Sequence, residues 1–178
     1  MHIGKKENAN LEILGLAAIL HDIGRLEEDK SGGKICHAEK GTILAKEILE
    51  KQNYEKKKID KIVHCIETHR FRNNKVPQTK EAKILYDADK LDAIGAVGVG
   101  RAFLFSGEFG ATLHIKNLDI EKTKPYSKQD TAYREFMVKL RKLKGKMFTK
   151  EGKILAEERH RYMKDFFNRL DKEVEGIL

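Results

Sequence analysis

Long apolar runs, cysteines and prolines are all scarce in this sequence of 178 residues. No apolar stretch approaches the ~20 residues that a helix needs to cross a bilayer, and charged residues interrupt the first 15 positions, where a signal peptide would be apolar. The two cysteines, Cys36 and Cys65, form no CxxC motif, and so few cannot form a disulfide scaffold. We therefore expect a cytoplasmic protein without a membrane span, folded as a single domain over residues 1–178.

The rarity of proline and the spacing of the apolar residues predict an all-α fold. The first helix is apolar around most of its circumference, so we expect it at the centre of the core. Asn10 and Thr79 are suited to cap the first and fourth helices, and the glycine-rich residues 95–100 allow either a break or close helix packing. The expected helices cover about residues 10–26, 37–52, 55–70, 79–94, 131–144 and 151–176.

The last expected helix carries an apolar stripe, which predicts a face turned toward the core. Its members are Leu155, Tyr162, Phe166, Leu170 and Val174.

Acidic residues are absent between Phe136 and Lys150, a stretch with six basic residues. Together with a formal net charge of +8 and a pI near 9.3, this raises nucleic acid as a partner. The basic residues are not interleaved with an aromatic stacking pattern, so we interpret the run as a solvated helix face and do not expect nucleic acid. A basic rim also suits a phosphorylated small molecule.

The most informative motif is the apolar run that ends in His21, Asp22, Ile23, Gly24 and Arg25. An imidazole and a carboxylate at the end of an apolar helix are costly to bury without partners. A divalent metal ion satisfies both, because it binds imidazole nitrogen and carboxylate oxygen. Arg25 suits either a phosphate contact or the negative end of the helix dipole.

Two further histidines are candidates for the same site. With Ile59 set at zero on the third helix, His69 falls at about 280°, at the edge of the buried arc, and His64 falls near 140°, outside it. His69 is therefore expected to point inward and His64 outward. His37 begins the second helix, where it can either cap that helix or face the site.

Three aspartates lie within six residues of the fourth helix, at Asp87, Asp89 and Asp92. Carboxylates among apolar neighbours need a metal, a cation or hydrogen-bond donors. Asp87 and Asp92 lie nearer the apolar arc, and Asp89 lies on its flank. Rotational phase alone does not select one of them as a ligand.

Taken together, the segments HDIG (21–24) and DADKLDAIGAVG (87–98) with His37 and His69 resemble the HD superfamily of metal-dependent phosphohydrolases. The resemblance is strongest to small, uncharacterised HD hydrolases and extends to residues 135–139, 149–156 and Arg159.

The resemblance implies an HD-domain helical bundle with one or two divalent metal ions, of which Mn, Mg, Fe, Ni, Co and Zn are not distinguished. It implies His21, Asp22 and Asp89 as metal ligands. His37 and His69 match positions that bind a second metal or the phosphate in family members. The implied reaction is hydrolysis of a phosphoester or phosphoanhydride, commonly of a nucleotide. We expect Asp92 or Asp87 to orient ligands and Arg25 to contact phosphate.

The family pattern also has a metal-binding histidine on a helix that precedes the HD helix. Here only His2 lies upstream, and helix geometry places it a turn or more short of His21. Either the first helix of the family is missing or shortened, or this protein binds metal with fewer ligands. We expect the former, which would expose apolar surface that a second subunit of a homodimer could cover.

Two other functions compete with a phosphohydrolase. A non-catalytic HD-fold module would sense a nucleotide or a metal without turnover. A basic helical protein would bind nucleic acid, with binding that falls steeply with salt.

Overall fold

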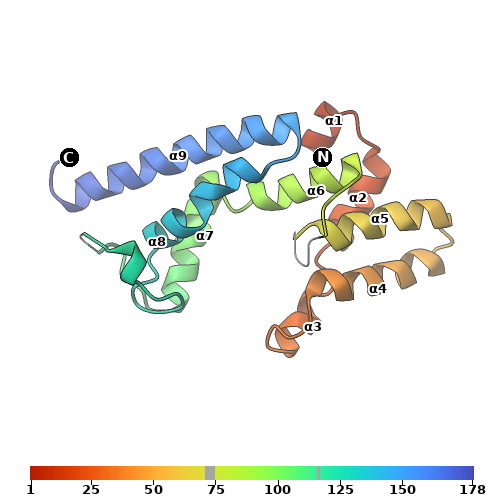
Figure 1. Ribbon diagram of the computed structural model, residues 1–178, viewed down its shortest axis with the longest axis horizontal. Coiled ribbons are helices and arrows are strands. Elements are labelled where there is room, and N and C mark those ends of the chain that lie inside the picture. Colours follow the sequence, from red (N-terminus) through yellow and green to blue (C-terminus); the bar gives the residue numbers. More distant parts are fainter. Residues whose placement is uncertain (71–74, 116) are drawn as a thin grey trace. The chain divides into compact units, whose positions relative to one another are not determined.

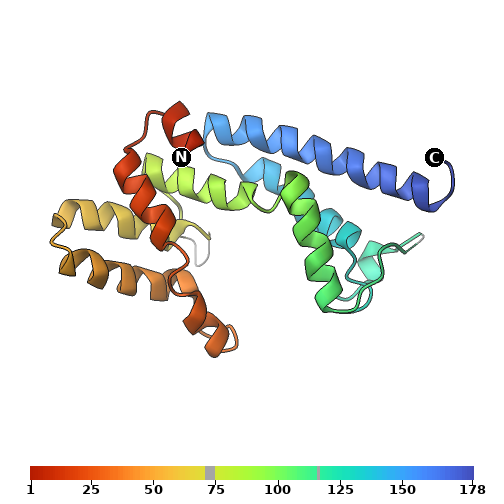
Figure 2. The ribbon, with the colours of Figure 1, turned by 180° about the vertical axis from the view of Figure 1, so that it is seen from behind.

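The computed structural model describes residues 1–70, 75–115 and 117–178 of the chain, and within them it contains helices and turns but no strand (Figures 1 and 2). The all-α prediction is confirmed, and none of the described helices has the length and apolarity that crossing a membrane requires. The helices are α1 (His2–Lys6), α2 (Leu11–Leu20), α3 (Arg25–Lys30), α4 (His37–Lys51), α5 (Lys56–Thr68), α6 (Lys80–Leu91), α7 (Gly95–Glu108), η1 (Ile120–Lys122), α8 (Ala132–Val138), η2 (Leu140–Lys146) and α9 (Lys150–Val174).

The chain forms two compact units. Unit 1 comprises residues 1–89 and 148–152, and unit 2 comprises residues 90–147 and 153–178. The sequence predicts a single domain over residues 1–178, which requires that the two units fold together. This stays a prediction.

Unit 1 is built on the pair α4 and α5, which a short turn joins and which lie side by side in both ribbon views (Figures 1 and 2). Helix α2 packs against α5 and buries Ile13, Leu14 and Ala17. The expectation that it lies at the centre of the core was wrong on its other side, where Ile19 is 79% exposed. The core of this unit consists mainly of aliphatic side chains, among them Ile13, Leu14, Ala17, Ala45, Leu49, Ile59, Ile62, Ile66, Ile84 and Leu85.

Both predicted caps form. The Asn10 side chain accepts from the backbone N–H groups of Glu12 and Ile13, each at 3.1 Å. The Thr79 hydroxyl oxygen accepts from Ala82 N at 3.2 Å. Each cap satisfies donors that the first turn of a helix leaves open, which explains why α2 and α6 begin where the sequence predicts.

The end predicted for the first helix is wrong. α2 stops at Leu20, residues 21–24 form turns, and the chain restarts as α3 at Arg25, whereas the apolar pattern predicted a helix to about residue 26. Gly24 explains the break, because its backbone lies directly against α4: a Cβ there would come within 2.4 Å of the His37 carbonyl oxygen.

Unit 2 contains α7, α8 and most of α9, with an aromatic core. α7 occupies the glycine-rich segment, and Gly95 begins it at φ +82°, where the side chain of Arg159 packs against it. On α9 the buried residues are Gly152, Ala156, Met163 and Phe167, while Tyr162 and Val174 are about half exposed. The predicted stripe was therefore wrong at these two positions.

A short return segment, residues 148–152, completes unit 1. The fully buried Asp87 carboxylate accepts from Phe148 N at 2.9 Å, Thr149 N at 2.8 Å and the Thr149 hydroxyl at 2.6 Å. Glu7 accepts from Glu151 N at 2.8 Å, and His2 pairs with the Glu151 carboxylate at 2.7 Å. The return segment is thus tied to both α1 and α6.

Candidate metal and phosphate site

The turn after α2 carries the first two candidate ligands, His21 and Asp22. His21 is the C-cap of α2, and Asp22 O accepts from Arg25 N at 2.9 Å, which fixes the turn into α3. The close approach of Gly24 to α4 brings this turn beside His37. The glycine of the HDIG motif therefore acts by letting two backbones touch, and so it places the His-Asp pair next to the start of α4.

His37 and His69 come from the two helices at the base of unit 1. His37 is the first residue of α4 and His69 is the C-cap of α5, and both side chains are fully buried. Their Nε2 atoms lie 3.1 Å apart. The prediction that His69 points inward is confirmed, and of the two alternatives for His37 the structure shows the inward one.

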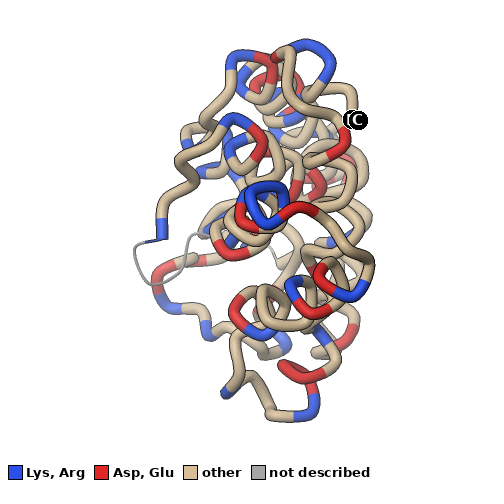
Figure 3. Tube along the Cα trace, turned by 90° about the vertical axis from the view of Figure 1, so that its right-hand side faces the viewer, with Lys and Arg blue, Asp and Glu red and all other residues tan. Residues whose placement is uncertain are grey.

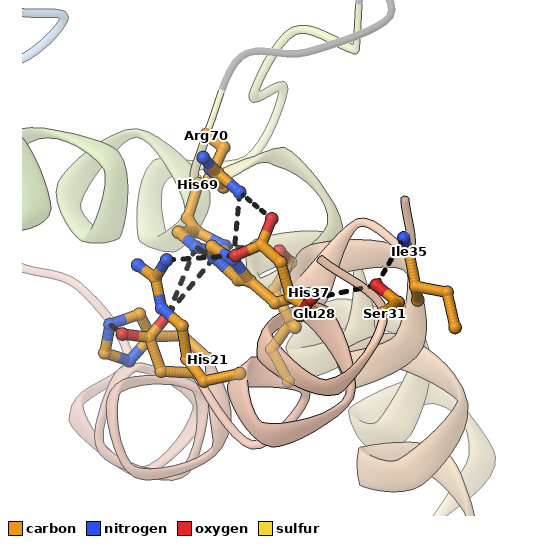
Figure 4. Close-up of polar contacts among 10 residues, drawn as sticks. His21, Glu28, Ser31, Ile35, His37, His69 and Arg70 are labelled. Carbon is orange, nitrogen blue, oxygen red and sulfur yellow. Dashed lines mark hydrogen bonds and ion pairs between the residues drawn. The ribbon is translucent and has the colours of Figure 1, made fainter. Parts of the chain in front are cut away.

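The Asp22 carboxylate contacts all three imidazoles, and Figure 4 shows His21, His37 and His69 together with Glu28 and Arg70. Its Oδ1 is 3.2 Å from His37 Nε2 and 3.7 Å from His69 Nε2, whereas its Oδ2 is 3.6 Å from His21 Nε2. One candidate ligand atom from each of Asp22, His37 and His69 lies within 4.8 Å of the others. The edge of the His21 ring meets the His69 ring at a centroid distance of 5.2 Å.

Each imidazole is anchored through Nδ1. The Nδ1 atom lies 2.8 Å from Ala18 O in His21, 2.6 Å from Ile66 O in His69, and 2.6 Å from a Glu28 oxygen in His37. Backbone carbonyls can only accept, so the Nδ1 atoms of His21 and His69 carry the proton and donate it. When these two rings are neutral, their Nε2 atoms are then unprotonated acceptors. His37 Nδ1 faces both the Glu28 carboxylate, which accepts, and Arg70 Nη1 at 2.9 Å, which donates, so its partners alone do not fix the tautomer of that ring.

Burial keeps the two inner rings neutral. It lowers the pKa of His69 to about 4, against the backbone hydrogen bond to Ile66. Burial also lowers the pKa of His37, against the hydrogen bond to Glu28 and with help from the nearby Arg25 and Arg70 charges. The two Nε2 atoms lie at hydrogen-bond distance, 3.1 Å, and the tautomer of His37 decides whether a proton lies between them.

The converging atoms fit a divalent cation. Within the described residues, Asp22 Oδ1 is buried and accepts no hydrogen bond, and it faces the two Nε2 atoms. A carboxylate oxygen and imidazole nitrogens that converge in this way can bind one divalent ion together. Neutral imidazole and carboxylate are also a donor set that Zn, Mn, Fe, Co and Ni accept.

Glu28 and Arg70 belong to the site and were not predicted. Arg70 Nη1 donates to Glu28 Oε1 at 2.8 Å and lies 2.9 Å from His37 Nδ1, and Arg25 pairs with the other Glu28 oxygen at 3.2 Å. Burial acts to raise the pKa of Glu28, but the hydrogen bonds and charges of His37 and Arg70 outweigh it and lower that pKa to about 2. Glu28 is therefore ionised, and two guanidinium groups flank it.

The remaining predicted residues lie as follows. Arg25 Nε is 3.2 Å from Asp22 Oδ1, at the edge of the cluster. Asp89 is a half-buried residue of α6 whose charge acts to raise the pKa of His69, so it is electrostatically linked to the cluster, although it lies outside the 4.8 Å group. Asp92 follows the end of α6, is exposed and pairs with Arg101 in unit 2.

Two candidates have other partners. The Asp87 carboxylate is occupied by the backbone of the return segment, so its role is structural. His64 is half-buried and accepts from Gln78 N at 3.0 Å. The assignment of His21, Asp22 and Asp89 as metal ligands stays a prediction, as does the role of Asp92 in orienting them.

The comparison with known families matches the model of the HD domain over residues 1–94 of this chain. The chain belongs to the HD-domain family. The matched range includes every residue of the cluster just described, from His21 through Arg70 to Asp89.

Relatives of this HD-domain protein are similar over nearly the whole chain. The uncharacterised protein YpgQ of Bacillus subtilis is 36% identical over 180 residues, which cover 99% of this chain and 79% of YpgQ. The crystal structure of YpgQ in complex with ADP matches with a TM-score of 0.73 and 33% identity, over 99% of this chain and 84% of that one. An HD-superfamily hydrolase from Bacillus thuringiensis matches with a TM-score of 0.76 and 29% identity, over 98% and 79% of the two chains.

Proposed function

We propose that this protein is a metal-dependent phosphohydrolase that acts on a phosphoester or phosphoanhydride of a nucleotide. The observation that carries the proposal is the convergence of three candidate ligand atoms, Asp22 Oδ1 and the Nε2 atoms of His37 and His69. Membership of the HD-domain family supports it, as do the description of the Bacillus thuringiensis relative as a hydrolase and the ADP complex of YpgQ.

The cluster offers places for one or two metal ions. His21, Asp22 and Asp89 would hold the first. Asp22 presents Oδ2 toward His21 and Oδ1 toward His37 and His69, so the same carboxylate can serve a second ion on the other side. A bound divalent ion lowers the pKa of coordinated water and neutralises negative charge on phosphoryl oxygens.

The two arginines supply the contacts that a phosphate needs. Arg25 and Arg70 both share the Glu28 carboxylate, and a guanidinium group donates two parallel hydrogen bonds to phosphate oxygens. An incoming phosphate therefore meets two cations that are already held beside the cluster. Glu28 keeps its hydrogen bond to His37 Nδ1, so the ring retains the orientation that presents Nε2.

The test uses the full chain, stripped of metal by a chelator and titrated with each candidate divalent ion. Release of phosphate and pyrophosphate is then measured over a panel of nucleoside mono-, di- and triphosphates. We expect metal-dependent release, with loss of both metal binding and turnover in His21→Ala and Asp22→Asn. Asp60→Asn, an exposed change on α5, is the matched control.

The other outcomes are equally specific. Unchanged metal affinity in His21→Ala contradicts the proposed ligand set. Binding of metal and nucleotide without release of either product contradicts the enzyme and supports the sensing module.

A further inference from the structure

Unit 2 contains a groove lined by residues of α8, η2 and α9. Its volume is about 380 Å³, which lies within the range of small-molecule sites. The lining residues are Tyr133, Phe136, Met137, Arg141, His160, Lys164, Phe167 and Asn168. None of them belongs to the histidine cluster, and the proposed function does not draw on them.

The floor of the groove is aromatic and rigid. The rings of Phe136 and Phe167 are stacked at a centroid distance of 4.9 Å, and both side chains are buried. Tyr133 meets Phe167 edge-on at 5.7 Å, and the His160 ring is tilted by 30° over Phe136 at 6.0 Å. The buried phenylalanine pair supports the half-buried rings of Tyr133 and His160, which offer a planar ligand ring contact without the ordering of flexible side chains.

Two cations at the groove have no carboxylate partner among the described residues. Within residues 1–70, 75–115 and 117–178, the guanidinium of Arg141 hydrogen-bonds to the Met137 sulfur alone, at 3.5 Å, and Lys164 forms no ion pair. Their basic neighbours Lys139 and Lys144 are instead paired with Glu135 and Glu157. Positive charge is therefore left uncompensated at this groove, which favours an anion.

Polar groups at the groove are also open to a ligand. Within the part of the chain that the structure describes, the Tyr133 hydroxyl, the Asn168 amide and the His160 imidazole nitrogens take part in no hydrogen bond. A heterocycle carries both donors and acceptors, and these three side chains can satisfy both kinds.

We infer that this groove binds a nucleoside diphosphate, with the base against the aromatic floor and the diphosphate between Arg141 and Lys164. A planar ring, heterocyclic polar edges and more than one negative charge are what these side chains recognise together. The groove offers one aromatic floor and two unpaired cations, which suits a mononucleotide rather than a strand that needs a succession of rings and charges. The inference stands on unit 2 alone and does not rest on the proposed function.

The experiment measures ADP binding to the full chain by calorimetry, in excess chelator so that the histidine cluster holds no metal. The ring C–H signals of His160 are followed by NMR in the same titration. The double variant Arg141→Ala/Lys164→Ala removes both cations, and Lys153→Ala/Lys172→Ala removes the same charge from exposed positions of α9 outside the groove. Adenosine, inorganic pyrophosphate and an oligonucleotide are the comparison ligands.

We expect one equivalent of ADP to bind, the His160 signals to shift, and the groove variant to bind about tenfold more weakly than the control variant. Adenosine and pyrophosphate should each bind more weakly than ADP. Equal ADP affinity in the two variants, or unmoved His160 signals, overturns the inference. Pyrophosphate binding as tight as ADP binding overturns the assignment to a nucleotide, and oligonucleotide binding that ADP fails to displace overturns it in favour of nucleic acid.

Discussion

The hydrogen-bond partner of His37 Nδ1 differs in kind from the partners of His21 Nδ1 and His69 Nδ1. His21 and His69 donate to backbone carbonyls of their own helices, whereas His37 is held by a side chain, Glu28. A backbone anchor survives any substitution of its residue. The orientation of His37, by contrast, depends on one carboxylate nine positions away in the sequence.

Replacing that carboxylate tests its role. In Glu28→Gln the amide oxygen can still accept from His37 Nδ1, but the negative charge that raises the basicity of the ring and pairs with both arginines is lost. We expect metal affinity to fall by about 10- to 100-fold, measured by competition with a fluorescent chelator. The neighbouring Glu27→Gln serves as control, and equal affinity in the two variants contradicts this role.

The two aspartates of the DAD segment should separate in their effects. Asp87→Asn weakens three buried hydrogen bonds to residues 148 and 149, so we expect it to lower the free energy of unfolding by about 1–3 kcal/mol in urea denaturation. Asp89→Asn should instead weaken metal binding while stability in chelator stays near that of the wild type. The reverse pattern would contradict the assignment of structural and ligand roles.

Residue-level prediction succeeded where a helix continued and failed where it ended. The phase of the third helix placed His69 inward because α5 is helical up to that residue. The same reasoning put Asp92 near the apolar arc of the fourth helix, but α6 ends at Leu91 and Asp92 is exposed. Glu28 and Arg70 gave no signal, because an isolated charge in a charged segment is typical of a solvated surface.

At the scale of elements, the turn between α2 and α3 decides the geometry of the cluster. When a helix is apolar on every side, the apolar pattern does not indicate where the helix ends. In this segment only Gly24 indicated a break between α2 and α3. The N-terminal helix caps could be predicted from the sequence because each is formed by one side chain, as at Asn10 and Thr79. On α9 the phase misplaced Tyr162 and Val174, since partners on α7 and α8 select the buried side.

Gly24→Ala probes the contact between this turn and α4. The added methyl group would lie 2.4 Å from His37 O and 2.8 Å from Gly41 N, so the backbones must separate. We expect a loss of about 1–3 kcal/mol in stability, together with weaker metal binding. Gly100→Ala on α7 meets no atom within 4 Å and should be neutral or stabilising by thermal denaturation. Equal melting temperatures in the two variants would refute the close-approach argument.

At the scale of the whole molecule, the charge is better described as mixed than as a single basic patch. Basic and acidic residues are interspersed along the trace (Figure 3), and the run that begins at Lys139 is partly neutralised by Glu135 and Glu157. This favours the interpretation of that run as a solvated face. Association into a homodimer and a cytoplasmic location stay predictions.

Metal binding should stabilise the fold of unit 1, and Cys65 can report it. Burial raises the pKa of this thiol to about 12, so at neutral pH Cys65 reacts only when the unit opens. If metal binds only the folded form, alkylation of Cys65 should slow by about 100-fold at a metal concentration 100 times the Kd, as followed by mass spectrometry. Asp22→Asn should abolish this protection, and protection that persists in the variant would place the metal elsewhere.

The return segment has a consequence for synthesis. Asp87 lies in the first part of unit 1, but its hydrogen-bond donors at residues 148 and 149 are translated 61 and 62 residues later. At about 5–20 residues per second, a ribosome needs seconds to make them. During that time the nascent chain already contains His21, His37 and His69. The Asp87 carboxylate still lacks its hydrogen-bond donors from residues 148 and 149 and remains hydrated. We therefore expect the histidine cluster to mature late, when the first turn of α9 has left the exit tunnel.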